Sequence, residues 1–247
     1  MTLQFTDKIV VVTGGTDGIG LTAARAFAAE GAQLYITGRD EDRLAAAVRD
    51  IGRGAIGVQG DVAKAADLDR LYARIERDHG RVDVVFANAG ISEQAALGLI
   101  DDAHFDRLFN INVKGLVFTV QKALPLMSTG GSVILAGSGA AVKGFPDLSI
   151  YSATKAAIRS LARGWTLELR DRGIRVNVVS PGMVLTPAMA TYFANNEGSQ
   201  AWMQQAIPFG RLAGTDEIAN AVLFLASEAG SFIGGEELRV DGGFTAV

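Results

Sequence analysis

A glycine-rich turn near the amino terminus constrains the fold of this chain more than any other stretch. The continuous β-branched run Ile9–Val12 precedes it, as in a parallel strand covered on both faces. The turn reads Gly14-Gly-Thr-Asp-Gly18-Ile-Gly20, and Leu21–Glu30 follows with helical spacing and stops at Gly31. Glycines let a phosphate approach the backbone, and unpaired amides at the helix start bind it. The stretch predicts a dinucleotide site, although its Gly-x-x-x-Gly-x-Gly spacing differs from the commoner Gly-x-Gly-x-x-Gly.

The rest of the chain repeats this alternation with short links. Further strands are predicted at Ala32–Thr37, Ala55–Val58, Val82–Phe86, Ser132–Leu135, Ile174–Val179 and Glu237–Val240. Further helices are predicted at Asp40–Val48, Ala65–Asp78, Phe105–Met127, Ser149–Arg170 and Asp216–Ser227. The pattern predicts an α/β, Rossmann-type doubly wound fold, with a seven-stranded parallel sheet flanked by helices in a single domain over residues 1–247. Ligands of such sheets bind at the carboxyl ends of the strands.

The segment 186–210 loses regular patterning but keeps large apolar side chains. These are Met189, Tyr192, Phe193, Trp202, Met203 and Phe209. The segment is interpreted either as a cover over a hydrophobic substrate pocket or as chain that packs on the body of the domain, because both use apolar contacts.

Composition excludes several classes of function. The formal net charge is −4 and opposite charges are interspersed, which argues against a nucleic-acid partner. Without cysteine there is neither a disulfide nor a thiolate metal site, and His79 and His104 have no second ligand nearby in sequence, so no metal is expected. His79 is expected to end a helix before Gly80. No signal peptide and no apolar run of about 18 residues is found, so we expect a cytoplasmic protein without a membrane partner.

Tyr151 and Lys155 are the first candidates for chemistry. They stand one turn apart on the helix expected from Ser149, so their side chains point the same way. A tyrosine that acts near pH 7 needs its pKa lowered by about 3 units, and an ammonium about 4 Å away supplies most of that. Taken alone, the pair also matches a rim aromatic beside a solvated charge.

Other polar residues follow the ends of the predicted strands. They include the turn Gly14–Gly20, Arg39, Asp61, Asn88, Ser138 and Thr186. Because the carboxyl ends of parallel strands share one edge, these residues should meet Tyr151 and Lys155 in one crevice.

The chain resembles the short-chain dehydrogenase/reductase family over essentially its whole length. The matching motifs are Thr13-Gly14-x-x-x-Gly18-x-Gly20, Asp61, Asn88-Ala-Gly90, Asn112-Val113, Ser138 thirteen residues before Tyr151, Tyr151-x-x-x-Lys155, and Pro181-Gly182 with Thr186. Phe118–Leu126 and Arg159–Trp165 are similar to bacterial alcohol dehydrogenases that reduce bulky ketones. The resemblance implies hydride transfer between a nicotinamide and a carbonyl or carbinol carbon of an apolar or bulky ketone or its alcohol.

The resemblance also implies roles for individual residues. Tyr151 would be the general acid in reduction and the base in oxidation, while Lys155 would lower its pKa and hold the nicotinamide ribose. Ser138 would hydrogen-bond the substrate oxygen, and Asn112 would steady a chain of waters; a strand-end cap and a helix-bend residue are their structural alternatives. The implied cofactor contacts are Gly14, Thr16, Asp17, Gly18, Ile19, Gly20, Arg39, Asp61, Val62, Asn88, Ala89, Gly90, Tyr151, Lys155, Pro181, Gly182, Val184 and Thr186.

The choice between NADP and NAD depends on the end of the second strand. Relatives that prefer NAD usually carry an acid there, whereas this chain has Gly38 followed by Arg39, which suits the extra phosphate of NADP. Asp17 either repels that phosphate or pairs with Arg39, and the alternative role of Asp40 is to cap its helix. NADP is therefore favoured over NAD.

Three other functions remain as alternatives: an NAD-dependent alcohol dehydrogenase, a 3-oxoacyl-thioester reductase and a nicotinamide-binding regulator without turnover. A thioester reductase needs a basic surface for an acidic carrier, and Lys143 is the obvious candidate. A sugar-nucleotide epimerase shares the Tyr-x-x-x-Lys pair, but the short tail after Pro181 leaves little room for its substrate domain. By analogy with the family, a homotetramer formed through Phe105–Met127 and Ser152–Arg170 is expected.

Overall fold

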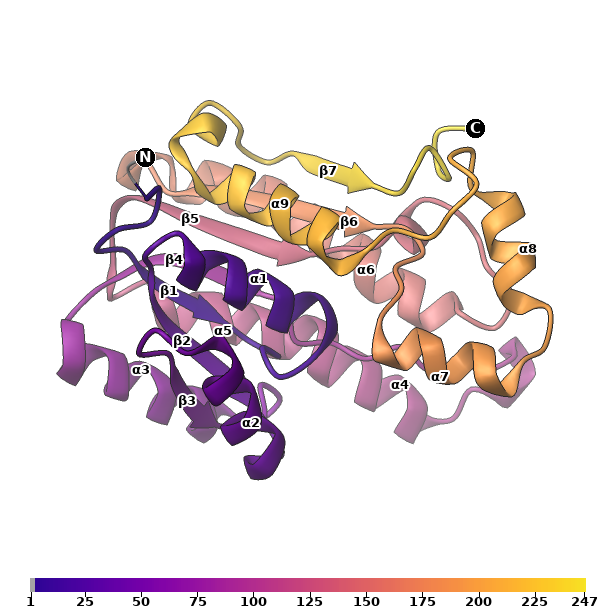
Figure 1. Ribbon diagram of the computed structural model, residues 1–247, viewed down its shortest axis with the longest axis horizontal. Helices are drawn as coiled ribbons and strands as arrows, with labels where there is room; N and C mark the ends of the chain where they lie inside the picture. Colours follow the sequence, from indigo (N-terminus) through magenta and orange to yellow (C-terminus); the bar gives the residue numbers. More distant parts are fainter. Residues whose placement is uncertain (1–2) are drawn as a thin grey trace.

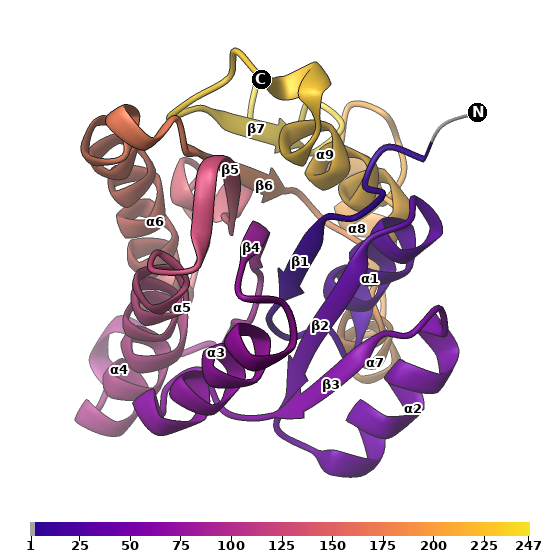
Figure 2. The same ribbon diagram turned by 90° about the vertical axis from the view of Figure 1, so that its left-hand side faces the viewer.

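The computed structural model describes residues 3–247, which contain one seven-stranded sheet. Every strand pair is parallel, and the order is β3-β2-β1-β4-β5-β6-β7 (Figures 1 and 2). The strands are β1 (Ile9–Val12), β2 (Gln33–Gly38), β3 (Ile56–Gln59), β4 (Val82–Ala87), β5 (Met127–Ala136), β6 (Arg175–Pro181) and β7 (Glu237–Val240). The predicted seven-stranded doubly wound fold is confirmed. The order reverses between β1 and β4, where such sheets bind their ligands.

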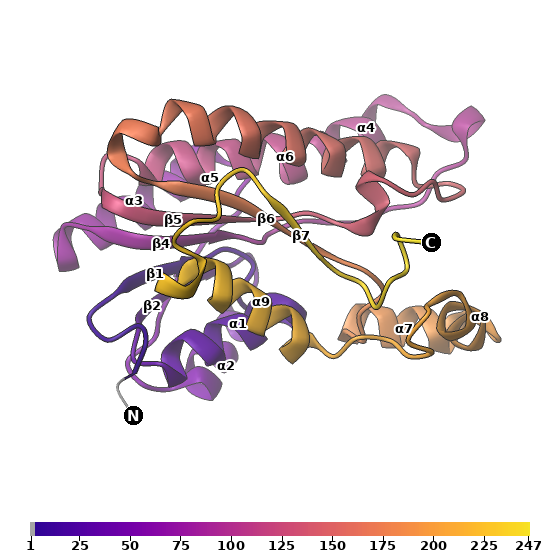
Figure 3. The same ribbon diagram turned by 90° about the horizontal axis from the view of Figure 1, so that it is seen from above.

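Helices cover both faces of the sheet (Figure 3). One layer holds α1 (Gly18–Ala29), α2 (Glu41–Ile51) and α9 (Thr215–Ala226), and the other holds α3 (Ala65–His79), α5 (Leu116–Ala123) and α6 (Ser149–Glu168). In β1, Val10 and Val12 pack into the first layer and Val11 into the second. Because both faces are buried, the strand is apolar throughout, as its sequence predicted.

The third helix matches its prediction closely. It buries one stripe of side chains, Leu68, Leu71, Tyr72 and Ile75, and its last residue is His79. Gly80 follows in the left-handed conformation, with φ of 67°, and its amide donates to the carbonyl of Glu76. The predicted helix end at His79 is therefore confirmed, since a residue in this conformation closes a helix.

The predicted helix Phe105–Met127 is wrong at both ends and in the middle. It begins earlier, as α4 (Asp102–Phe109), widens into a π-helical segment at Asn110–Gly115 and continues as α5 to Ala123. Pro125 has no amide hydrogen to continue the ladder, so the chain turns and β5 begins at Met127. A π segment inside a helix commonly marks a functional site.

The segment 186–210 contains two short helices, α7 (Pro187–Asn195) and α8 (Ser199–Ala206), where no regular pattern was predicted. Both lie beyond the carboxyl ends of the strands (Figure 1). Phe193 and Met203 pack on a small apolar cluster that includes Ile207 and Phe244. Packing on the body is therefore observed, and a cover over a substrate pocket stays a prediction.

Within residues 3–247 no helix combines the length and the apolar character needed to span a bilayer.

Candidate active site

A cleft of about 310 Å³ lies at the carboxyl ends of the central strands, a volume typical of small-molecule sites. It is bounded by the start of α1, the ends of β4, β5 and β6, the first turns of α6, and α7. The predicted site residues that line it are Ile19, Asn88, Gly90, Ser138, Tyr151, Lys155, Pro181, Gly182, Val184 and Thr186. The structure thus brings residues from five separate segments into one place.

Tyr151 and Lys155 both face this cleft from α6, which begins at Ser149 as predicted. The Lys155 ammonium lies 5.7 Å from the centroid of the Tyr151 ring and donates to the carbonyl of Ala136 at 2.8 Å. Lys155 is 6% exposed, so its position is set by the end of β5 and by the helix that carries it.

Burial dominates the pKa of both groups. It lowers the pKa of Lys155 to about 8. Burial also raises the pKa of Tyr151, and the hydrogen bond with Ser138 opposes that rise. Lys155 was expected to lower the pKa of this phenol, but within the protein the main effect has the opposite direction. Near neutral pH Tyr151 therefore keeps its proton, the form needed to donate it.

Ser138 has the capping role considered for it, and its bond to a substrate oxygen stays a prediction. Its hydroxyl oxygen accepts from the amide of Ala140 at 3.1 Å and so caps the short 3-10 turn Gly139–Ala141. Ser138 and Tyr151 line the same cleft, and the Ser138 hydroxyl opposes the rise in the pKa of Tyr151. Because a cap restrains the side chain, Ser138 is held where a substrate oxygen next to Tyr151 could reach it.

Asn112 lies in the π-helical segment and is completely buried. Its amide oxygen accepts from the backbone of Ile91 at 2.8 Å, and its amide nitrogen donates to the carbonyl of Ile91 at 2.9 Å and to the Thr154 hydroxyl at 3.2 Å. The side chain therefore ties the segment after β4 to α6, a role not among those predicted, and its part in a chain of waters stays a prediction.

The glycine-rich turn leaves no room for side chains. A Cβ atom on Gly20 would lie 2.2 Å from the carbonyl oxygen of Gly14, and one on Gly14 would lie 3.0 Å from Ala89. Asn88 secures the turn by donating to the carbonyls of Thr13 and Gly14 at 3.0 and 3.2 Å. The first amides of α1 have no partner within the helix, so the turn suits a dinucleotide phosphate.

The residues that separate NADP from NAD are arranged differently from the prediction. Asp17 caps α1, accepting from Gly18 at 2.7 Å, and its other oxygen pairs with Arg43 at 2.5 Å, not with Arg39. Asp40 caps α2 by accepting from the Arg43 amide, the capping role considered for it. Arg39 is exposed at the end of β2.

Gly38 has a steric reason to be glycine. A Cβ atom at this position would lie 2.3 Å from the Thr16 methyl carbon, far inside van der Waals contact. An acidic side chain at the end of β2, the usual mark of NAD preference in the family resembled, would require Thr16 to move from its present orientation.

Three predicted cofactor residues, Asp61, Val62 and Ala89, do not line the cleft, whereas Thr186 does. Asp61 accepts from the amide of Ala63 at 3.0 Å, and Val62 packs against Gly115. The Ala89 amide donates to the Thr13 hydroxyl at 3.2 Å. Thr186 caps α7 by accepting from Met189 at 3.2 Å.

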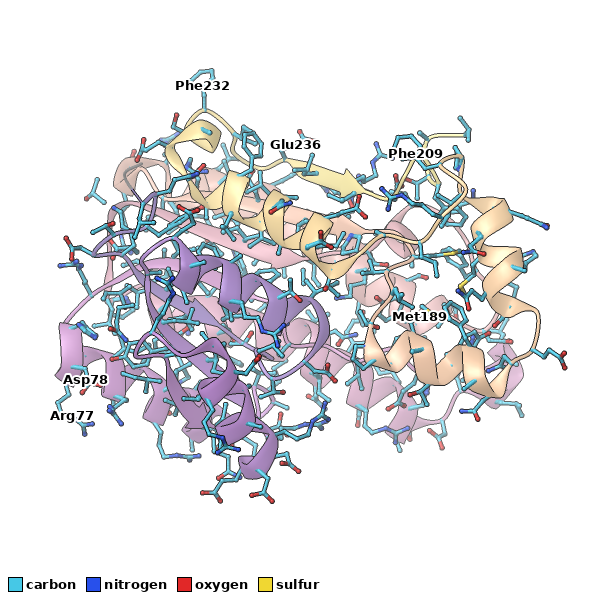
Figure 4. The ribbon with its side chains drawn as sticks, viewed as in Figure 1. Arg77, Asp78, Met189, Phe209, Phe232 and Glu236 are labelled. Carbon is cyan, nitrogen blue, oxygen red and sulfur yellow. The ribbon has the colours of Figure 1, made fainter. Side chains whose placement is uncertain are left out.

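Six residues lining the cleft were absent from the predicted site: Phe86, Ile91, Ala136, Gly137, Val179 and Met189. Most directly neighbour predicted residues at strand ends, so extending each predicted motif by one or two positions would have included them. Met189 was noted only as an apolar residue of the cover, and Figure 4 places it between α7 and the strand tips.

A larger hollow, of about 540 Å³, lies between β3 and α3. Its arginines, Arg70, Arg74 and Arg77, are paired with Asp67 or Asp78. Figure 4 shows Arg77 and Asp78 at the opposite end of the molecule from Met189. None of the predicted site residues lines this hollow, so the smaller cleft is the candidate site.

Comparisons with known proteins agree with this geometry. The profile of a family described as "Enoyl-(Acyl carrier protein) reductase" matches residues 14–245. The oxidoreductase asL5 of Sarocladium schorii is 44% identical over 99% of this chain and 98% of its own length. The cis-4-hydroxycyclohexanecarboxylate dehydrogenase of Sinomonas cyclohexanicum is 39% identical over 98% of both chains. A short-chain dehydrogenase/reductase of Brucella melitensis, described as a glucose/ribitol dehydrogenase, superposes with a TM-score of 0.93, 31% identity and 99% coverage of both chains.

Proposed function

This chain belongs to the short-chain dehydrogenase/reductase family, and we propose that it interconverts an apolar or bulky ketone and its secondary alcohol with NADP(H). Membership makes it an oxidoreductase that acts on CH–OH groups and uses NAD(P)(H). The observation that carries the proposal is the convergence of Ser138, Tyr151 and Lys155 in one cleft beside the glycine-rich turn.

Three side chains provide the proton chemistry. The bound nicotinamide would supply or accept the hydride at the carbon of the carbonyl. In reduction, Tyr151 donates its phenolic proton to the carbonyl oxygen, and Ser138 donates a hydrogen bond to the same oxygen as negative charge develops there. Lys155 holds a positive charge near the phenol and favours the phenolate that forms. In oxidation the phenolate accepts the proton back.

Preference for NADP follows from the charges around the end of β2. Pairing with Arg43 neutralises Asp17, which removes the main objection to a phosphate there. Arg39 is exposed at the same strand end, and position 38 is a glycine, where an acidic side chain would collide with Thr16 in its present orientation. An exposed guanidinium beside a doubly charged phosphate favours its binding.

Calorimetric titration tests the cofactor preference. The parent should bind NADPH more tightly than NADH, and Arg39→Ala should weaken NADPH binding by about tenfold while NADH changes little, since only NADPH carries the extra phosphate. Arg53→Ala, on the exposed turn after α2, serves as the control. Equal affinities of the parent for the two cofactors would contradict NADP preference.

An apolar substrate is supported by the lining of the cleft. Among the described residues that line it, Lys155 alone carries a charge, while Ile91, Val184 and Met189 are apolar. A charged substrate would need a charged partner to offset its loss of water.

A 3-oxoacyl-thioester reductase is the second candidate, because the description of the matching family also names a thioester on an acyl carrier protein, there an enoyl group. The basic residue expected to serve its acidic carrier is already engaged, because Lys143 donates to the carbonyl of Phe244 at 2.8 Å. Assays of NADPH oxidation with apolar ketones and with acetoacetyl thioesters distinguish the two. Faster turnover of the thioesters would overturn the ketone proposal, and no turnover of either would favour a regulator.

We further propose that the enzyme acts in the cytoplasm as a homotetramer. Phe105 on α4 and Leu167 on α6 are 41% and 68% exposed, and such apolar side chains on adjacent helices support association of copies through this face. Light scattering after size-exclusion chromatography measures the assembly, and a monomer or dimer would contradict it.

A further inference from the structure

The chain after β7 folds back on itself into a compact turn that we call the C-terminal hook, residues 241–247. The Asp241 carboxylate accepts from the amides of Gly243 and Thr245, each at 3.0 Å, and from the Thr245 hydroxyl. Gly242 and Gly243 have φ of 61° and 86°, which lets the chain reverse. The hook is therefore a defined structure and not a trailing end.

The hook contacts two segments that border the cleft. A Cβ atom on Gly182, at the end of β6, would lie 2.6 Å from that of Asp241. The carbonyl of Gly242 accepts from the amide of Phe209 at 3.3 Å, just after α8. Figure 4 shows Phe209 beside the carboxyl terminus. One face of the hook thus packs against a cleft-lining residue and the end of the cover.

Lys143 connects the hook to a third segment. Its ammonium donates to the backbone oxygens of Phe244 and Val247 at 2.8 and 3.5 Å and lies 4.1 Å above the centroid of the Phe244 ring. Phe145 stacks on the same ring, with centroids 5.8 Å apart. All of these contacts of the Lys143 ammonium are made with the hook. We call Lys143 a latch, because it joins its own segment to the hook.

The latch lies close in sequence to Ser138. The amide of Lys143 donates to the carbonyl of Gly139 at 3.1 Å, and a Cβ atom on Gly139 would lie 3.1 Å from the Thr245 methyl carbon. Ser138 immediately precedes this turn and interacts with Tyr151. A shift of the turn away from the hook would move the Ser138 hydroxyl away from Tyr151.

We propose that Lys143 is a positioning residue: by latching the turn Gly139–Phe145 to the C-terminal hook, it holds Ser138 in place against Tyr151. The proposal rests on the function proposed above, in which Ser138 and Tyr151 share the substrate oxygen. It assigns the hook and Lys143 a part in catalysis without contact to substrate or cofactor.

Kinetics of Lys143→Met test the latch, because methionine keeps the length of the side chain and removes the donor and the charge. We expect kcat/KM for ketone reduction to fall by about tenfold, as for loss of a charged hydrogen bond, mainly through kcat. The dissociation constant of NADPH should stay within about twofold, since the bonds that Lys143 makes are to Phe244 and Val247 and not to a predicted cofactor contact. Lys143→Arg should recover most of the activity, because arginine donates to carbonyls and stacks on a ring.

The pH profile separates positioning from simple loss of stability. The interaction with Ser138 opposes the rise in the pKa of Tyr151, so its loss should raise that pKa further. Alcohol oxidation needs the phenolate, and its acidic limb should therefore move to higher pH in Lys143→Met but not in the control Lys122→Met. Lys122 is a comparable lysine, paired with Asp69 on another face of the molecule.

Hydrogen exchange of amides 139–145 decides the latch independently of turnover. Exchange should be faster in Lys143→Met than in the parent and unchanged in Lys122→Met. Parent-like exchange or parent-like kcat/KM in Lys143→Met would overturn the inference, as would loss of NADPH affinity together with activity. If the parent protein reduces no carbonyl compound, the proposed function is wrong. The exchange rates of amides 139–145 then still show whether Lys143 holds this segment.

Discussion

The two sides of the cleft are held together in different ways. On the nucleotide side, the backbone is packed so closely that a methyl group on Gly20 would overlap a carbonyl oxygen. On the substrate side, Gly144 has nothing within 4 Å of a Cβ position, and the segment is held by Lys143 through contacts with a chain segment 101 residues away. A tight local turn thus holds one lining residue, Ile19, and an open, remotely supported loop follows another, Ser138. The glycine-rich turn therefore tolerates few side chains, whereas the loop at Gly144 has space for other residues.

Replacing Tyr151 by phenylalanine should give the largest loss of activity. It should also separate catalysis from cofactor binding most clearly. Loss of the only proposed proton donor should lower kcat by about a thousandfold, because general acid catalysis contributes up to that order. Binding of NADPH, measured by calorimetry, should remain near that of the parent. Tyr192→Phe, on α7, is the matched control and should change kcat little. Activity of Tyr151→Phe near the parent level would contradict the mechanism.

Paired alanine substitutions at Gly20 and Gly144 test the difference in packing directly. Gly20→Ala should cost about 3 kcal/mol of folding free energy and weaken NADPH binding, because the obstacle is backbone and cannot rotate away. Gly144→Ala should stay within about 0.5 kcal/mol of the parent. Urea unfolding measures both. Equal stability of the two variants would remove the contrast between the sides.

Lys155 lies in the same cleft as both sides. Its contribution to the free energy of unfolding should be smaller than the effects above and should depend on pH. Burial lowers the pKa of Lys155 to about 8. At pH values between this pKa and the ordinary pKa of lysine, the folded protein therefore binds fewer protons than the unfolded chain. Stability contributed by this group is therefore lost as pH falls through about 8 and gained as pH rises. From about pH 7.5 to about pH 9.5 the gain should be about 2 kcal/mol.

Urea unfolding of the parent and of Lys155→Met at the two pH values isolates this contribution. The parent should gain stability relative to the variant as the pH rises. The buried tyrosines, whose pKa values are raised, act above the ordinary tyrosine pKa of about 10 and so outside this range. Identical pH dependence in the two proteins would show that Lys155 is not buried as a charge.

The same contrast explains what could be predicted from the sequence. The glycine-rich turn and the Tyr151–Lys155 pair depend on spacing within a few residues, and both lie where they were predicted. The pair of Asp17 with Arg43 could not be read from local spacing, because it joins a turn to the next helix, and Arg39 was the nearer candidate. The bonds of Lys143 to the hook are more distant still.

Two errors in the predicted elements had usable signals. Pro125 ends the long helix before Met127, as a residue without an amide hydrogen should. Thr186 followed by Pro187 is a typical helix start, and α7 begins there. Weak apolar periodicity concealed α7 and α8, because their buried contacts are made with a small separate cluster and not with the main core.

The contact between Gly38 and Thr16 has a consequence for how such an enzyme could change its cofactor over evolution. An acid introduced at the end of β2 meets the threonine methyl with its first carbon, so the threonine must turn away or be replaced by a smaller residue. Residues 16 and 38 stand far apart in the sequence, so the two changes would have to arise separately. A change of cofactor preference is therefore slower here than where a single substitution suffices.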